Sequence, residues 1–192
     1  MKEDLRVQKT KAALFRAFYE LLAEKSYESI TINELCERAM VRRATFYKHY
    51  RDKQDFLLGL VSRFREQFRA MIKADGESIT LAEYFTKYIS NTVDRIVTYP
   101  EIVKNILASQ MRDPFINVVR RSNFKDAIDR INEAAALGVR ISVSTEVAAS
   151  MIVGGSSILL IQWFENGMQI PRERLEADIA ETIKRVLSCE KV

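Results

Sequence analysis

Residues 31–53 read TINELCERAMVRRATFYKHYRDK and contain two short helical patterns with almost no residues between them. Thr31, followed three residues later by Glu34, forms a capping box, which predicts that a helix begins here. Apolar residues then recur at helical spacing on one face of this segment: Ile32, Leu35, Cys36 and Ala39. The first half of the stretch therefore predicts a short amphipathic helix.

The second half of the stretch predicts a turn and then another helix. The turn is expected near Met40 and Val41, and the helix from Arg43 onward, with Phe46 and Tyr50 four residues apart and facing the core. Two helices of this length joined by three or four residues form a helix-turn-helix, whose second helix can enter the DNA major groove.

The charge of this stretch favours a nucleic-acid partner. From Arg38 to Lys53 there are six basic residues and one acidic residue, a concentration suited to the attraction of phosphates. The alternative interpretation is a solvated helical hairpin that carries basic residues without binding DNA. The capping box, the short turn and the outward Tyr47 together favour DNA binding.

Residues 39–61, AMVRRATFYKHYRDKQDFLLGLV, resemble the second half of the DNA-binding domain of TetR-type (TetR/AcrR) transcriptional regulators. The family pattern Ala-Gly-Val-Ser-x-Gly-Thr-x-Tyr-x-His-Phe is followed by a Lys that opens the next helix. It is matched here at Ala39, Val41, Thr45, Tyr47, His49 and Lys53, with Tyr50 as the final aromatic residue and Ala44 as the small residue. Met40 replaces the turn glycine and Arg42 replaces the capping serine, so a less favourable turn and a missing cap are expected.

The hairpin supplies the predicted DNA-binding residues. We expect Thr31, Tyr47, Lys48 and Lys53 to position the phosphate backbone. The start of the second helix, where base edges are usually met, holds Arg42, Arg43, Ala44 and Thr45, and Arg43 is the expected guanine reader. His49 completes the predicted set.

Composition limits the class of protein further. The 192 residues are 47% hydrophobic, enough for a real core, and the net charge is +4. The first 75 residues hold 16 basic and 11 acidic residues, whereas the remainder hold 14 and 15, so the nucleic-acid signal is N-terminal. Cys36 and Cys189 are expected to be free thiols in a reducing cytosol. No signal peptide is recognised, and the longest apolar run, residues 148–164, is interrupted by polar residues and is a poor membrane span, so we expect a cytoplasmic protein without a membrane partner.

The whole chain is predicted to be all-α, with about nine helices, because no segment alternates with period two. A first helix is expected over residues 6–25, and a long helix from Lys53 to about residue 73 leads into the C-terminal part of the chain. The polar segment ADGES, residues 74–78, marks the expected boundary. We thus predict a DNA-binding domain over residues 1–52, a connecting helix over 53–73, and a helical regulatory and dimerisation domain over 78–192. Later helices are expected to begin near Thr80, Pro100, Pro114, Ser144 or Thr145, and Pro171, the last of them ending near Cys189.

Two surfaces are predicted in the C-terminal part. The helix that begins near Thr145 is apolar on several faces, so it is either central to its own domain or covered by a second chain; the family resemblance implies a homodimer. The expected dimer residues are Met151, Gly154, Gly155, Ile158, Leu159, Ile179, Ile183 and Val186. The resemblance also implies a pocket for a small apolar inducer, for which the candidates are Phe85, Tyr88, Tyr99, Met111, Phe115, Phe124 and Trp163, although aromatic residues at helical spacing are more often core.

Taken together, the sequence predicts a DNA-binding transcriptional regulator that recognises a palindromic duplex and is a repressor released by an inducer. An enzyme is disfavoured because His49 is the only histidine and lies in the expected recognition helix; neither a metal site nor a cofactor is expected. The remaining alternative is a helical adaptor or co-activator of the same fold that acts through protein contacts.

Overall fold

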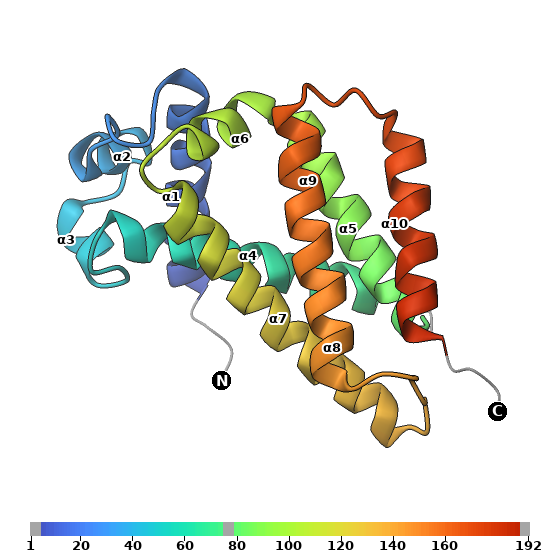
Figure 1. Ribbon diagram of the computed structural model, residues 1–192. Coiled ribbons are helices and arrows are strands. Elements are labelled where there is room, and N and C mark those ends of the chain that lie inside the picture. The colour runs from blue at the N-terminus through green and yellow to red at the C-terminus, as the bar shows by residue number, and fades with distance from the viewer. Residues whose placement is uncertain (1–4, 75–78, 189–192) are drawn as a thin grey trace. The chain divides into compact units, whose positions relative to one another are not determined.

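The computed structural model describes residues 5–74 and 79–188, which contain helices and no strands. Their order is α1 (Leu5–Glu24), α2 (Ile32–Arg38), α3 (Arg43–Tyr47), α4 (Lys53–Ala74), α5 (Leu81–Thr98), α6 (Pro100–Leu107), α7 (Arg112–Ala136), α8 (Thr145–Ser150), the π-helical turn η1 (Met151–Gly155), α9 (Ser156–Glu165) and α10 (Arg172–Leu187) (Figure 1). Because α8, η1 and α9 are continuous, these described residues form nine helices, as the sequence predicts. The all-α prediction is confirmed.

Local capping explains several helix ends. Thr80 and Glu83 form a complete capping box at the start of α5, and the Ser144 hydroxyl accepts a hydrogen bond from the Val147 amide at the start of α8. Gly138, after α7, has a φ of 90°, which a glycine adopts without strain. One start was misplaced: α7 begins at Arg112 rather than at Pro114, because a proline within the first turn has no intrahelical N–H bond to lose.

The chain divides into two compact units whose boundary differs from the one suggested by the sequence. The N-terminal unit contains residues 1–65 and 99–116, and the C-terminal unit contains residues 66–98 and 117–192, so α4 and α7 each begin in the first unit and end in the second. Most of the expected linker, residues 75–78, lies outside the described residues, as does Cys189. The assignment of a DNA-binding and a regulatory role to separate ranges stays a prediction.

The N-terminal unit has one apolar core beneath its helices. The central side chains come from α1, α2, α3 and α4, and the largest that are fully buried are Leu14, Phe18, Leu21, Leu22, Ile30, Leu35, Phe46, Phe56 and Leu57. Helix α6 packs on α1 (Figure 1), where Ile102 and Ile106 join this core. The Asn105 side-chain amide donates to the Leu22 carbonyl at 2.6 Å, which satisfies an otherwise open carbonyl at the end of α1.

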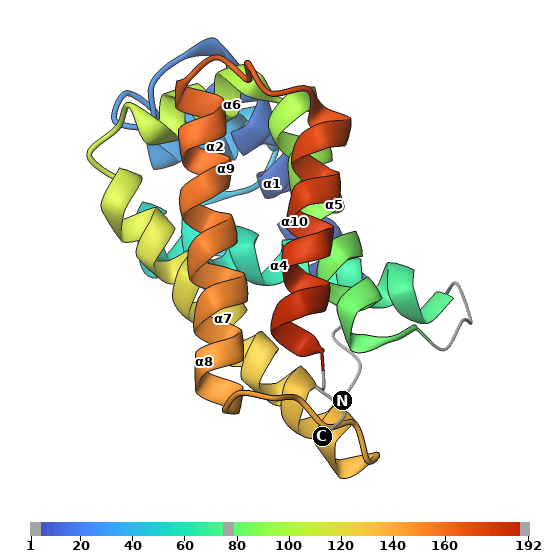
Figure 2. The same ribbon diagram turned by 45° about the vertical axis from the view of Figure 1, so that its right-hand side comes forward.

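The C-terminal unit is a helical bundle in which α5 contacts both α9 and α10 (Figure 2). Its core includes Phe68, Val93, Ala148, Trp163 and Ile183. Asp126 is the buried charged residue among the described positions, with 6% exposure. Its carboxylate pairs with Arg69 and accepts a hydrogen bond from the Tyr84 hydroxyl at 2.7 Å, so the buried charge is compensated.

The continuous helix from Thr145 to Glu165 has the length and composition that would allow it to cross a membrane, with a mean hydropathy of 1.7 over an 18-residue window. A third of that window (33%) is buried within the chain. The same composition is found in core helices of soluble proteins, so this property alone does not distinguish a membrane span from a helix that is covered by protein.

Candidate nucleic-acid interface

The helix-turn-helix forms where the sequence predicts it, from α2, a four-residue connection and α3. The Thr31 hydroxyl accepts the Glu34 amide at 3.2 Å, which confirms this half of the capping box. In the connection, the Met40 amide donates to the Glu37 carbonyl and the Val41 amide donates to the Cys36 carbonyl, at 3.0 and 2.9 Å. These bonds end α2 and direct the chain into α3.

An aromatic cluster fixes the orientation of α3. Phe46 is fully buried, and its ring lies 5.7 Å from Phe56 and 5.5 Å from Tyr50. Tyr50 in turn packs edge-on against Phe56 at 4.9 Å. The ring of Tyr50 also requires Gly59, because a Cβ at that position would lie 2.8 Å from a ring carbon. With Phe46 turned inward, the opposite face of α3 is presented to solvent.

Most of the side chains predicted to contact bases or phosphates are exposed to solvent. Of the predicted DNA-binding residues on the helix-turn-helix, six are exposed: Thr31, Arg42, Arg43, Ala44, Tyr47 and Lys48. Thr45 and His49 are half-buried. The Arg43 guanidinium lies over the Tyr47 ring, 5.5 Å from its centroid, and reaches its hydroxyl at 3.4 Å. Arg42 occupies the N-cap of α3 without a side-chain capping bond, as expected from the missing serine. The roles of these residues stay predictions.

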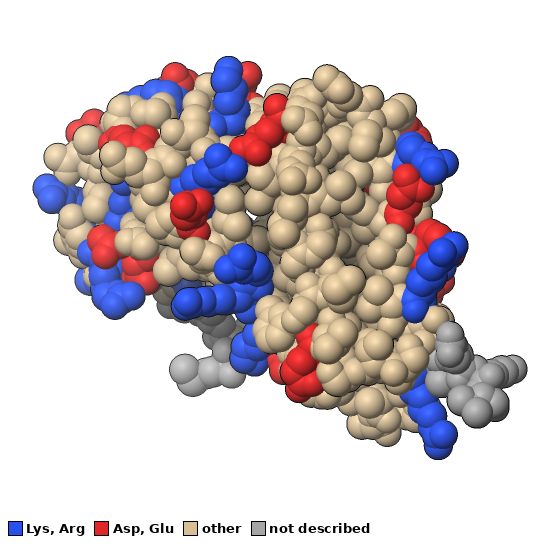
Figure 3. Space-filling model, in the orientation of Figure 1, with Lys and Arg blue, Asp and Glu red and all other residues tan. Residues whose placement is uncertain are grey.

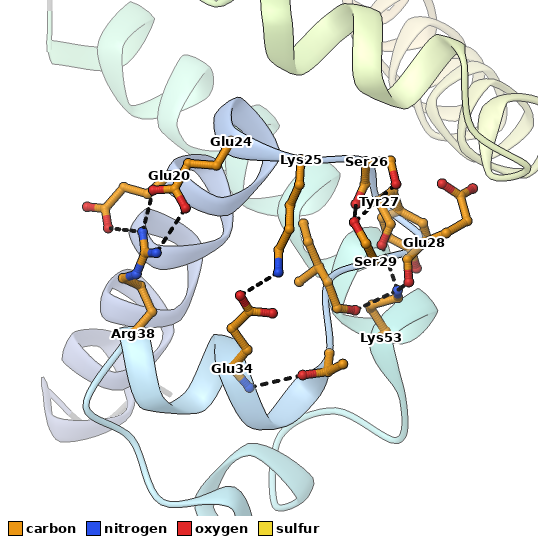
Figure 4. Close-up of polar contacts among 12 residues, drawn as sticks. Glu20, Glu24, Lys25, Ser26, Tyr27, Glu28, Ser29, Glu34, Arg38 and Lys53 are labelled. Carbon is orange, nitrogen blue, oxygen red and sulfur yellow. Dashed lines mark hydrogen bonds and ion pairs between the residues drawn. The ribbon is translucent and has the colours of Figure 1, made fainter.

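Ion pairs connect α2 to the end of α1 (Figure 4). Arg38 donates to both oxygens of Glu24, at 2.8 and 2.9 Å, and Lys25 pairs with Glu34. The bond from Arg38 lowers the pKa of Glu24, and the bond from Lys25 lowers the pKa of Glu34. Arg38, which is part of the basic stretch, is therefore engaged within the protein.

Lys53 contacts the backbone that precedes α2. Its ammonium donates to the carbonyl oxygens of Tyr27 and Ile30, at 2.7 and 2.8 Å, and lies 4.1 Å from the centroid of the Tyr27 ring (Figure 4). Partial burial lowers the pKa of Lys53 and raises that of Tyr27 to about 12. A contact between Lys53 and phosphate stays a prediction. Sequence analysis missed these bonds to the backbone, because the carbonyls that accept them are more than twenty residues away.

An open groove of about 320 Å³ separates α2 from the start of α3. It is lined by Asn33, Cys36, Glu37, Met40, Val41, Arg42 and Arg43. Cys36 is buried, and this burial raises the pKa of its thiol. Apolar, acidic and basic side chains therefore line this groove, which lies beside the start of α3.

The fold and this surface define a helix-turn-helix domain of the type found in DNA-binding regulators. Residues 14–60 match the family model described as bacterial regulatory proteins, tetR family. The HTH-type transcriptional regulator YxbF of Bacillus subtilis, itself uncharacterized, is 44% identical over 61 residues, which are 31% of this chain and 16% of that protein. Residues 14–60 of this chain are therefore similar to the tetR family of bacterial regulatory proteins.

Solved structures extend the likeness from the domain to the whole fold. A TetR-family regulator from Syntrophomonas wolfei superposes with a TM-score of 0.72 over 96% of this chain and 98% of that one, at 19% identity. The regulator FadR of Bacillus subtilis, solved with stearoyl-CoA, gives 0.63 over 92% and 97%, at 18% identity. At such identities the likeness concerns the fold alone. The chain spans less than half the length of the curated relatives that it matches.

The predicted pocket residues are divided between the units. Tyr99, Met111 and Phe115 lie in the N-terminal unit, where Met111 and Phe115 pack on its core and Tyr99 stacks on Tyr19 at 6.0 Å. Phe85, Tyr88, Phe124 and Trp163 belong to the C-terminal unit. There Phe85 and Trp163 are buried in the core, and the Tyr88 hydroxyl donates to Asn123 at 2.8 Å. A pocket lined by these side chains stays a prediction.

The predicted dimer residues also fall into two groups. Met151 and Ile158 are each 59% exposed, Gly155 is exposed, and Gly154 and Leu159 are half-buried. Ile179 and Ile183 are buried in the core of their own unit, and Val186 is half-buried and packs against the same core. A role of these residues in pairing stays a prediction. Among the described residues, η1 and α9 carry the exposed part of this predicted set.

Proposed function

We propose that the chain is a sequence-specific DNA-binding regulator of transcription that reads a palindromic duplex as a homodimer. The observation that carries this proposal is the outward face of α3, where Arg43, Tyr47 and Lys48 are exposed on a helix anchored by buried Phe46. A helix that is fixed in this manner can enter the major groove while its basic residues meet phosphate and base edges. We place this activity in the cytoplasm.

The proposed homodimer is formed through η1 and α9, where Met151 and Ile158 are exposed. The face of the molecule over this continuous helix carries few charged side chains (Figure 3). A Cβ added to Gly154 or Gly155 would meet nothing within 4 Å, so this surface leaves room for another helix to approach. A two-fold pair of α3 helices would match a two-fold operator, which is the reason for proposing a palindrome.

We further propose that the regulator is a repressor and that a small, largely apolar molecule releases it from DNA. FadR of Bacillus subtilis was solved in complex with stearoyl-CoA, and it shares the fold of this chain. The acyl chain of stearoyl-CoA is apolar, whereas its CoA part is charged. A largely apolar ligand of this chain would bind among the aromatic residues of the C-terminal unit and must favour the arrangement that does not bind DNA. A hundredfold loss of affinity requires about 2.7 kcal/mol of differential binding, within the usual range of allosteric coupling.

Selection of bound duplexes from a random pool, followed by titration of the selected duplex at several salt concentrations, tests this proposal. We expect enrichment of a palindrome and a steep salt dependence, because counterions are released from phosphates. The alternative is an adaptor that acts through protein contacts. If no sequence is enriched and the protein shows no salt-dependent retention on duplex DNA, DNA recognition is rejected and the adaptor is favoured.

A further inference from the structure

Met40 has a backbone conformation that disfavours its side chain. Its φ is 53°, in the left-handed region that glycine occupies readily and other residues occupy at a cost of about 1–2 kcal/mol. The bonds from the Met40 and Val41 amides to the end of α2 hold the chain in this turn. The methionine is therefore strained by the geometry that the helix-turn-helix requires.

Packing within the protein does not compensate for this strain. The Met40 side chain is 89% exposed, more than any other large apolar residue among the described positions. Burial of apolar area, the usual benefit of a methionine, is accordingly almost absent here. A glycine would strain the turn less, so the methionine at this position points to a contact with another molecule.

The position of Met40 indicates what that reason is. Met40 lines the same groove as Arg42 and Arg43, so its thioether lies on the surface from which α3 begins. The C5-methyl group of thymine is the apolar feature that the major groove presents to a protein. A flexible, polarizable thioether is well suited to pack on such a methyl group.

We propose that Met40 is a specificity-determining residue that packs on the C5-methyl of a thymine in each half of the recognised duplex. The inference rests on the proposed DNA-binding function. In this proposal, Met40 makes an apolar contact from the turn, in addition to the polar contacts expected from α3. The gain in base preference accounts for a methionine where the backbone of the turn favours glycine.

The test compares the unaltered protein with Met40→Gly in two measurements. Met40→Gly removes the side chain and the backbone strain, so we expect a higher unfolding temperature. In binding, replacing the critical thymine by deoxyuridine removes only its methyl group. We expect this replacement to weaken the unaltered protein about fourfold per half-site, as for one buried methyl-sized group, and to leave Met40→Gly unaffected.

Other outcomes reject the inference in distinguishable ways. If the unaltered protein enriches no sequence, the proposed DNA recognition fails and the role of Met40 fails with it. If the unaltered protein enriches a sequence but deoxyuridine affects it and Met40→Gly equally, only the role of Met40 is overturned. Met40→Gln, which keeps the length and the strain but is polar, is the second variant and is expected to lose the same thymine preference.

Discussion

The Lys53 ammonium donates a hydrogen bond to the Ile30 carbonyl at 2.8 Å and thereby joins the first turn of α4 to the segment that precedes α2. Replacing Lys53 with methionine keeps the aliphatic length but leaves the carbonyls of Tyr27 and Ile30 without this donor. We expect the free energy of unfolding to fall by about 1–3 kcal/mol, the cost of leaving partly buried acceptors unsatisfied. Urea denaturation measures it.

Lys48→Ala is the matched control for Lys53, because the Lys48 side chain is exposed on α3. We expect it to leave stability nearly unchanged and to reduce the slope of log K against log salt by about one unit, the effect of one lost phosphate contact. A Lys53 variant of normal stability with a reduced slope would instead establish Lys53 as a phosphate contact and refute the structural role.

Arg43→Ala is predicted to relax base preference at a guanine in each half-site, at a cost of about 1–3 kcal/mol for a bidentate contact. Arg43 is placed for this by its stacking on Tyr47 at the start of α3. Duplex selection with the variant measures the preference. A uniform loss of affinity over all sequences would mean that Arg43 contacts phosphate only. Tyr47→Phe keeps the ring and should retain the guanine preference.

Gly155→Glu is predicted to abolish the homodimer and to weaken operator binding. A Cβ added at this position meets no atom within 4 Å apart from its own stretch of helix, so the substitution should fold normally and place a charge on the apolar face. Sedimentation velocity measures the mass. Ala177→Glu, on the exposed side of α10, is the control and should remain a dimer. An intact Gly155→Glu dimer would locate the pairing surface elsewhere.

Acid is predicted to weaken the N-terminal unit partly through Glu24. The bond from Arg38 lowers the pKa of the Glu24 carboxyl in the folded state, so the folded protein binds fewer protons than the unfolded chain. The resulting stability is present above the unfolded pKa and is lost as pH falls through the folded value. Glu24→Gln should show a smaller loss of urea midpoint between about pH 6 and about pH 3.5 than the unaltered protein. An identical loss would contradict this role.

Tyr84→Phe is predicted to destabilise the C-terminal unit by about 1.5–3 kcal/mol, because it removes a hydrogen bond to the buried Asp126 carboxylate. Tyr88→Phe is the matched control: its hydroxyl donates to the neutral Asn123 amide oxygen, so the loss should be about 0.5–1.5 kcal/mol. Thermal unfolding of both variants compares them. Equal losses would show that the charge of Asp126 contributes little to the bond.

Local signals account for the features that the sequence predicted well. Thr31, Thr80 and Ser144 begin helices through bonds to residues three positions away, and the strain at Met40 follows from the turn alone. Contacts that join distant segments were not predictable in this manner. The bonds of Lys53 go to carbonyls whose direction depends on the folded backbone, and the burial of Ile179 depends on α5, far away in sequence.

The inclusion of residues 99–116 in the N-terminal unit limits how this chain can be recombined with related ones. A chimera that took only its first 74 residues would discard Ile102, Ile106 and the amide of Asn105, and would leave bare the part of α1 on which they pack. An exchange of the C-terminal unit, in evolution or in engineering, must therefore keep α6 together with the helix-turn-helix. The functional cassette is discontinuous in the gene even though it is contiguous in the fold.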